Sequence, residues 1–288
     1  MRAAVDPSST NSFAQSSQLW ISQIGAIVRI ELKKALWMRR SIWIYLIALG
    51  PAAVIGLHAL NSPFGRYCNI SDDTNVLATI FQIFYLRGVI FFGCMGLFTW
   101  LFRGDVVEKS LHYYFLSPVR REVLAAGKFL AGLAGSSIIF GGSVLLSFAL
   151  MYGHFGRAGA DFVFHGPGFG QLLAYLGVTL LACLGYGSVF LALSLVVKNP
   201  ILPGALVLLW ETFHAVLPPL LQKFSVIFYL KQLCPVSVAP SGITALFTVV
   251  AEPVSAPVAV AGLILLSIAV LTCACLRIRR TEISYLAD

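Results

Sequence analysis

Charged side chains are scarce in this sequence: Asp, Glu, Lys and Arg together make up 11% of its 288 residues. Apolar residues reach 58%, and the mean hydropathy is +0.86. A soluble domain carries roughly 25% charged and 45–50% apolar residues. The low charge content excludes an ordinary soluble enzyme and a disordered chain, and it predicts an integral membrane protein whose apolar surface faces lipid.

Motifs for catalysis and for resident cofactors are also missing. The six cysteines form no CxxC pair and no Cys/His spacing suited to zinc. The sequence has no HExxH motif, and its five histidines lack the paired pattern of a membrane haem site. Gly127-Lys128 is followed by Phe129, and the upstream glycine of a P-loop is absent. We therefore expect no catalytic residue, metal or cofactor on this chain, which is not an enzyme in this interpretation.

Long uncharged runs dominate what is present. Six apolar segments are long enough to cross a ~30 Å hydrocarbon core at about 1.5 Å per residue. They cover residues 41–60, 76–102, 122–152, 171–197, 201–221 and 256–276. We therefore predict an all-α polytopic membrane domain over residues 41–276, preceded by a flexible tail over 1–18 and followed by a tail over 277–288.

Residues 19–40 show helical rather than membrane-spanning character. One stripe of this segment is apolar and consists of Trp20, Ile24, Ile27, Val28, Leu32 and Ala35. Most of the basic residues lie off that stripe, which is typical of an amphipathic interfacial helix lying in the membrane surface. A solvated helix packed on a partner is the alternative.

The segment between the last two predicted spans, residues 222–255, is rich in proline. Its two apolar stretches, 224–230 and 243–250, are each too short to cross a bilayer. We expect short re-entrant or interfacial helices that form a cap on the outer face, with short strands as the alternative.

The distribution of basic residues predicts an orientation. Six crossings place both termini on one side, and that side holds 15 of the 20 Lys and Arg residues. The opposite side holds Arg66, Arg157, Lys223 and Lys231, and Arg87 lies within a span. Because basic residues concentrate on the cytoplasmic side, we expect a multi-pass protein of the cell (inner or plasma) membrane with both termini in the cytoplasm. The net charge of +8 then reflects topology, and no nucleic acid partner is expected.

The longest cytoplasmic loop covers residues 103–121 and joins the second and third predicted spans. Residues 105–116 can form a short helix with acidic side chains near its start, where the helix dipole favours them, and Pro118 ends it. Charged flanks and the aromatic pair Tyr113–Tyr114 suit docking onto a cytoplasmic partner. A plain connector between two spans is the alternative.

The same loop carries an ordered motif. Residues 108–111 read Glu-Lys-Ser-Leu, residues 116–121 read Leu-Ser-Pro-Val-Arg-Arg, and Gly127-Lys128 follows. This order resembles the loop of ABC-2 type permeases, the membrane subunits of ABC transporters. The predicted topology, with its amphipathic first helix and long outer segment, is also similar to that family. Ser110 stands where the family more often has threonine, and residues 112–114 are less aliphatic than usual.

The resemblance implies a permease subunit of an exporter that is driven by a separate ABC ATPase subunit, with ATP and Mg²⁺ bound on that partner. It implies that the loop contacts the ATPase through Asp105, Glu108, Lys109, Ser110, Leu111, Tyr113, Tyr114, Leu116, Pro118, Arg120 and Arg121. A second copy of the chain, in a homodimer, would enclose the path. An ATP-independent secondary transporter is the alternative, and a membrane enzyme or scaffold is a third class.

Two charged side chains lie deep in predicted spans. Arg87 lies roughly 16 Å and Glu211 roughly 15 Å from the start of its span, by the helical rise per residue. Charges at such depth are costly and are commonly paired or functional. We expect Arg87 and Glu211 to pair or to line one polar cavity of a translocation path, together with His214. A structural ion pair that only fixes helix packing is the alternative.

Cys68 and Cys234 are the cysteines of the predicted outer loops. An oxidising exterior permits a disulfide between them, which would tie the first outer loop to the last. Two free thiols are the alternative.

Overall fold

The computed structural model describes residues 7–37, 41–61, 69–107, 120–197, 201–238 and 254–279. Every regular element in these ranges is a helix, and no strand occurs among them. The helices are α1 (Pro7–Trp37), α2 (Ser41–Asn61), α3 (Ile70–Ile80), the π-helical segment η1 (Phe81–Val89), α4 (Ile90–Val107), α6 (Arg121–Gly153), α7 (Arg157–Phe164), α8 (Gly168–Val196), α9 (Ile201–Phe213), the 3-10 turn η2 (His214–Val216), α10 (Pro219–Gln222), α11 (Val226–Leu233) and α13 (Ala256–Arg279). The predicted all-α fold class is confirmed.

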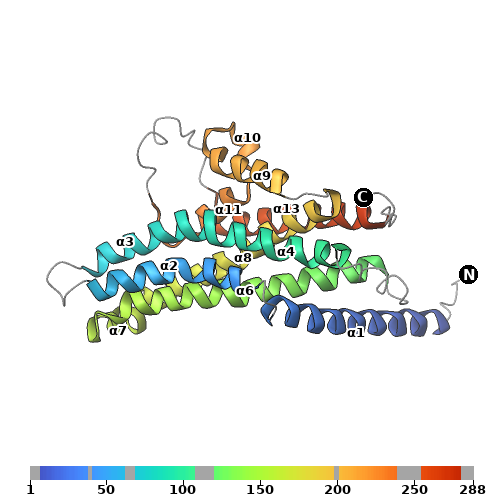
Figure 1. Cartoon of the computed structure of the whole chain (residues 1–288), viewed down its shortest axis with the longest axis horizontal. Helices are drawn as coiled ribbons and strands as arrows, with labels where there is room; N and C mark the ends of the chain where they lie inside the picture. Colours follow the sequence, from blue (N-terminus) through green and yellow to red (C-terminus); the bar gives the residue numbers. More distant parts are fainter. Residues whose placement is uncertain are drawn as a thin grey trace, which may run out of the picture.

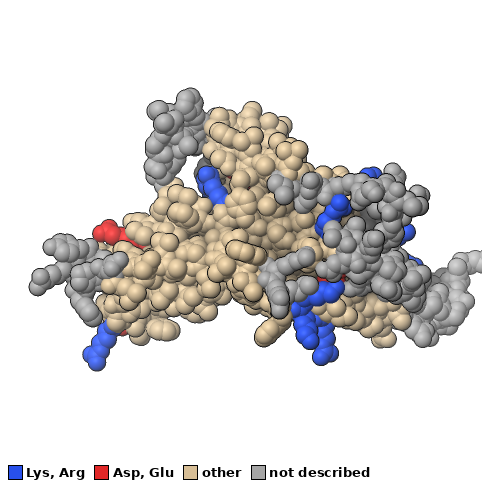
Figure 2. Space-filling model, in the orientation of Figure 1, with Lys and Arg blue, Asp and Glu red and all other residues tan. Residues whose placement is uncertain are grey.

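The long helices lie side by side along the long axis of the molecule (Figure 1). Five helical runs are long and apolar enough to cross a membrane: Ser41–Leu60, Ile70–Asp105, Arg121–Gly153, Gly168–Val196 and Ala256–Arg277. They correspond to five of the six predicted spans and indicate a membrane protein. Lys and Arg side chains gather mostly towards the end of the molecule that carries α1, and few interrupt the middle of the visible surface (Figure 2).

The predicted span over residues 201–221 is not one continuous helix. The α9 helix has 13 residues, which cover roughly 20 Å at 1.5 Å per residue and fall short of a ~30 Å core. The 3-10 turn η2 follows, and two prolines, Pro218 and Pro219, separate it from α10. The described residues between α8 and α13 therefore form four short elements (Figure 1), and a sixth membrane-spanning helix is not confirmed.

Several boundaries differ from those predicted. The α1 helix begins at Pro7, so the described part of the predicted tail, residues 7–18, is helical. At the other boundary, α4 continues to Val107, which places residues 103–107 of the predicted loop in a helix. The first short apolar stretch after the broken span forms α11, as expected, whereas residues 243–250 lie outside the described ranges.

The apolar stripe of α1 faces α6 of the same chain. Ile27 and Ala35 are buried, and they lie against Gly127 and Gly135 of α6. Both helices run in the same direction, so residue i of α1 meets residue i+100 of α6 at each of these contacts (Figure 1). The predicted stripe is thus a packing surface, and it explains why α1 lies alongside the N-terminal half of α6.

Glycine allows α4 and α6 to approach closely. A Cβ atom at Gly93 would lie 2.1 Å from Cζ of Phe140, whose side chain is fully buried and has no room to move. One turn along α4, a Cβ at Gly96 would meet nothing within 4 Å. The two positions form a matched pair in the same helix.

We expect Gly93→Ala to lower the free energy of unfolding by about 1–3 kcal/mol, because the added methyl group overpacks a full core. Gly96→Ala should leave stability unchanged or raise it by up to about 1 kcal/mol through helix propensity. Thermal unfolding in detergent, followed by a thiol-reactive dye at the buried Cys94 and Cys183, measures both variants. Equal midpoints for the two variants would show that α4 and α6 are not packed this closely.

Candidate functional site

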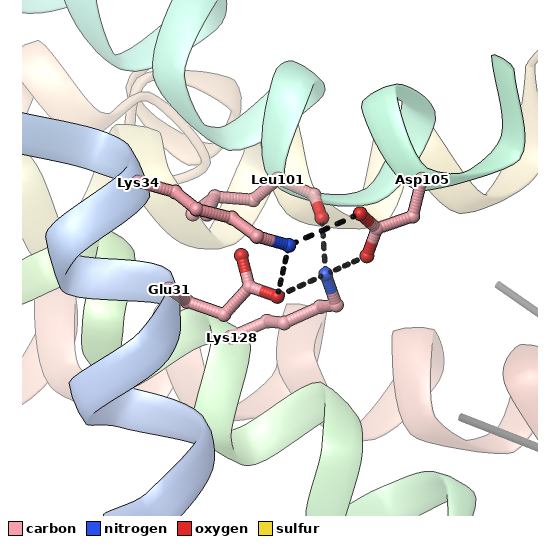
Figure 3. Close-up of polar contacts among 5 residues, drawn as sticks. All are labelled: Glu31, Lys34, Leu101, Asp105 and Lys128. Carbon is pink, nitrogen blue, oxygen red and sulfur yellow. Dashed lines mark hydrogen bonds and ion pairs between the residues drawn. The ribbon is translucent and has the colours of Figure 1, made fainter. Parts of the chain in front are cut away.

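A buried ammonium group joins three helices at the end of the bundle that carries α1. Lys128 of α6 is completely buried. Its Nζ donates to Oε1 of Glu31 at 3.0 Å, to the carbonyl oxygen of Leu101 at 2.6 Å and to the carboxylate of Asp105 (Figure 3). The three protons of the ammonium group therefore have acceptors from α1 and α4, which is the condition under which a lysine can be buried.

A second lysine completes the arrangement. Nζ of Lys34 lies 3.4 Å from Oε1 of Glu31 and 3.5 Å from Oδ1 of Asp105 (Figure 3). Two carboxylates and two ammonium groups balance in charge, so the group as a whole need not hold an uncompensated charge away from water. We call Glu31, Lys34, Asp105 and Lys128 the buried charge cluster.

Helical spacing brings these residues together. Glu31 and Lys34 are three residues apart on α1, and Leu101 and Asp105 are four apart on α4, so each pair shares one face of its helix. The parallel packing of α1 on α6 positions Lys128 next to the cluster residues of α1, because Lys128 directly follows Gly127, which contacts Ile27. The cluster therefore depends on the register of all three helices.

Further contacts join α1 to its neighbours. The guanidinium of Arg120, at the start of α6, lies 4.7 Å from the centroid of the Trp20 ring on α1. At the other end of α1, Oγ of Ser41 donates to the carbonyl oxygen of Ala35 at 2.6 Å and the hydroxyl of Tyr45 to that of Leu36 at 3.2 Å. These bonds hold α1 to both α6 and α2.

The predicted ATPase-coupling residues fall into two groups. Asp105 is buried in the last turns of α4 and bonds Lys128, so it does not begin a loop helix as predicted. Arg120 stacks on Trp20, and Arg121 begins α6. The others lie outside the described residues and keep their predicted role untested: Glu108, Lys109, Ser110, Leu111, Tyr113, Tyr114, Leu116 and Pro118.

Sequence reasoning missed three members of the buried charge cluster. Glu31 is the one acidic residue of α1, and it lies on the helix's apolar stripe. Lys128 is a lysine within an otherwise apolar stretch of α6. Both are signals of buried partners, since isolated charges on apolar faces are seldom left unpaired. Lys34 carried no such signal, because its side chain is 38% exposed at the rim of the cluster.

Glu211 is not paired with Arg87, although both residues are described. Its Oε2 accepts from Oγ of Ser225 and from the backbone N–H of Ile227, each at 2.9 Å, and its Oε1 accepts from the N–H of Val226 at 3.0 Å. The carboxylate thus caps the N-terminus of α11 from a neighbouring element and satisfies first-turn N–H groups that have no partner within the helix. This arrangement favours a structural role for Glu211, and a shared polar cavity stays a prediction.

His214 is held close to Glu211, as its spacing predicts. Nδ1 of His214 lies 2.8 Å from the carbonyl oxygen of Glu211. Because a carbonyl can only accept, Nδ1 carries the proton and Nε2 is an acceptor in the neutral ring. The helix changes from α9 to the 3-10 turn η2 at this residue.

Arg87 lies in η1, a nine-residue π-helical segment. Such segments are uncommon and often occur at functional sites. Its side chain is half-buried, and its Nε is buried without a hydrogen-bond partner. Lys231 of α11 is close by: burial lowers the pKa of its ammonium group to about 8, and the Arg87 guanidinium acts in the same direction.

Three ionisable residues meet at the opposite end of the bundle from the buried charge cluster. The carboxylate of Asp73, which is buried, lies 3.4 Å from Nε2 of His58 and 3.5 Å from Nε2 of His154. They join the ends of α2, α3 and α6, a juxtaposition that the sequence did not reveal. Within the described ranges no three His, Cys, Asp or Glu side chains have an arrangement that could hold a metal ion.

Cys234, at the end of α11, has a free thiol in this structure. Its Sγ lies 3.4 Å from the carbonyl oxygen of Leu230, and burial raises the pKa of the thiol to about 12. Cys68 lies outside the described residues, so the disulfide between the two stays a prediction.

Comparison with known proteins adds no family assignment. No protein-family model matches the sequence, and no curated protein matches it at a significant level. The resemblance to ABC-2 permeases therefore depends on the loop motif and on the order of the predicted elements.

Proposed function

We propose that this chain is the membrane permease subunit of an ATP-binding cassette exporter, driven by a separate ATPase subunit that binds ATP and Mg²⁺. The motif of residues 108–121 supports the proposal by its resemblance to the coupling loop of ABC-2 permeases. Five apolar helices of spanning length supply a membrane domain. In this proposal both termini lie in the cytoplasm, the protein resides in the cell membrane, and two identical copies enclose the path.

The buried charge cluster is the single observation that carries the proposal. Asp105 lies two residues before the end of α4, and Lys128 lies seven residues after the start of α6. The coupling loop runs between those two helices, so its two roots are joined to each other and to Glu31 of α1. A force on the loop is thereby applied to three helices at once.

Electrostatics makes this connection stiff. Separating one member of a buried ion pair from its partner leaves an uncompensated charge in a medium of low dielectric constant, at a cost of about 3–5 kcal/mol. Helices α1, α4 and α6 would therefore move as one unit when the ATPase pushes the loop. The Arg120–Trp20 contact adds a second connection at the root of α6.

One observation favours the alternative, a secondary transporter. The described residues between α8 and α13 form four short elements, and the α3–α4 run changes to a π-helix in η1, which resembles the irregular helices of ion-coupled transporters. Glu211, the acidic residue of the broken segment, is engaged with α11. Uptake by vesicles that contain this chain alone, driven by an ion gradient, would select the alternative.

Replacing Glu108, Tyr113 and Tyr114 together by alanine should remove the ATPase from the purified complex. These side chains supply the charge and the aromatic area of the predicted docking helix. Truncation of side chains at the centre of an interface weakens binding by about ten-fold or more. Affinity purification from native membranes, with bound ATPase measured by ATP hydrolysis and mass spectrometry, gives the result.

Arg157→Ala is the matched control, because Arg157 begins α7 at the opposite end of the bundle (Figure 1). It should retain the ATPase at the level of the unmodified chain. No ATPase with the unmodified chain, or the same amount with the triple alanine variant, would contradict the proposed coupling.

A further inference from the structure

Two cationic side chains belong to elements that pack together near the middle of the α3–η1–α4 run. Arg87 belongs to η1 and Lys231 to α11, and these two elements are in contact. Burial lowers the pKa of the Lys231 ammonium group, Arg87 acts in the same direction, and Cys234 and His214 also interact electrostatically with Lys231. A hydrogen bond of 2.8 Å from Nε2 of Gln82 to the carbonyl oxygen of Val236 fixes η1 to the segment that follows α11.

No acidic partner neutralises these charges in the described part of the chain. The ion pairs found there involve other residues, and Nε of Arg87 is buried without a hydrogen-bond partner. Both carboxylate oxygens of Glu211, the nearest acid of the broken segment, are bonded to residues 225–227. The fully buried Tyr186 on α8 lies within electrostatic range of both Arg87 and Glu211.

The cationic pair borders an apolar surface. Ile83 and Phe84 lie four and three residues before Arg87 in η1, within one turn of the π-helix, and both are exposed. Phe213, at the end of α9, is exposed as well. A small hydrated anion would gain nothing from these side chains, whereas a molecule with an acyl or other apolar part would bury them.

We infer that Arg87 and Lys231 bind the oxyanion headgroup of an amphiphilic molecule whose apolar part lies against Ile83 and Phe84. A guanidinium group offers two parallel N–H donors to a phosphate or carboxylate, and the ammonium group adds a third donor. The anion supplies a counter-charge that no ion pair among the described residues gives to Arg87 and Lys231. As a statement about what is transported, the inference rests on the proposed function, because it names the substrate class of that permease.

The test measures lipid binding by the purified chain in detergent, with native mass spectrometry as the readout. The probes are dioleoyl phosphatidylglycerol, which carries one negative charge, dioleoyl phosphatidylcholine, which carries none, and inorganic phosphate. Lys231→Gln should weaken binding of the anionic lipid about ten-fold by removing one charge-assisted bond. Lys223→Gln, at an exposed lysine of the same segment, should bind like the unmodified chain.

The pH dependence provides a second, independent readout. Lys231 is charged below its pKa of about 8 and neutral above it, so affinity for phosphatidylglycerol should fall between about pH 7 and about pH 9. Lys231→Arg keeps the charge throughout that range and should abolish the fall. Arg87→Gln, where it folds, should weaken binding at least as much as Lys231→Gln.

Equal affinity of the unmodified chain and Lys231→Gln would overturn the inference. So would displacement of the lipid by inorganic phosphate, which would make the ligand a free anion, or equal binding of phosphatidylcholine by the unmodified chain. Each measurement uses this chain without an ATPase. Failure here therefore leaves the ATPase co-purification result standing, and failure of co-purification leaves the binding site standing.

Discussion

Lys128→Met is expected to lower the free energy of unfolding by about 3–5 kcal/mol, because it leaves the carboxylates of Glu31 and Asp105 buried without their main cation. Met matches the length and apolar stem of lysine, so packing is largely retained. Thermal unfolding in detergent, monitored at the buried thiols of Cys94 and Cys183, measures the loss. If the proposed function is correct, the partner ATPase should then hydrolyse ATP without transport.

Lys34→Met is the matched control. Lys34 contacts the same two carboxylates, but its side chain is 38% exposed, so water can replace it at a cost of about 1 kcal/mol or less. A triple variant, Glu31→Leu with Asp105→Leu and Lys128→Met, removes the buried charges together and should recover most of the stability. The proposed function predicts that transport stays impaired in that triple variant, because the polar connection between α4 and α6 at the two ends of the loop is gone. If Lys128→Met and Lys34→Met are equally stable, the cluster does not hold the three helices.

Hydropathy predicted the five long helices well, because a helix that faces lipid needs about 20 consecutive apolar residues and little else. The same criterion failed for residues 201–221. That stretch is apolar enough to span, but its course is set by Pro218 and by the bond between Glu211 and α11. The partner of Glu211 lies 14 to 16 residues further along the chain, in a contact that composition does not reveal.

The contacts of the candidate site were also not predictable from the sequence, because they join residues that are far apart along the chain. Asp105 and Arg120, which the sequence predicted as coupling residues, take part in contacts with α6 and α1, while their coupling role stays a prediction. The sequence did not reveal their partners, because the contacts depend on how α1 packs on α6, where each contacting residue of α1 meets the residue 100 positions later. The isolated acid on α1 was a usable signal, since a buried carboxylate needs a cation or hydrogen-bond donors as partners.

Glu211→Ala is expected to destabilise the protein by about 3–5 kcal/mol, because three buried donors lose their acceptor at about 1–3 kcal/mol each and such losses are not fully additive. Ser225, Val226 and Ile227 are all buried, so water cannot replace the carboxylate. Glu211→Gln keeps one acceptor oxygen but turns an NH₂ group towards N–H donors, and it should lose about half as much. Thr212→Ala is the control, since Thr212 is exposed and bonds only the carbonyl of Leu208 in its own helix.

Amide hydrogen exchange separates the capping role of Glu211 from a role in the translocation path. If the carboxylate holds the first turn of α11, Glu211→Ala should lose protection at the amides of Val226 and Ile227 more than at any other segment, since those N–H groups have no partner within their helix. A residue that only lines a path would leave these amides protected while transport falls. Unchanged exchange in α11, together with normal thermal stability and lost transport, would therefore contradict the capping role of Glu211. It would support the alternative that Glu211 lines the translocation path beside Arg87.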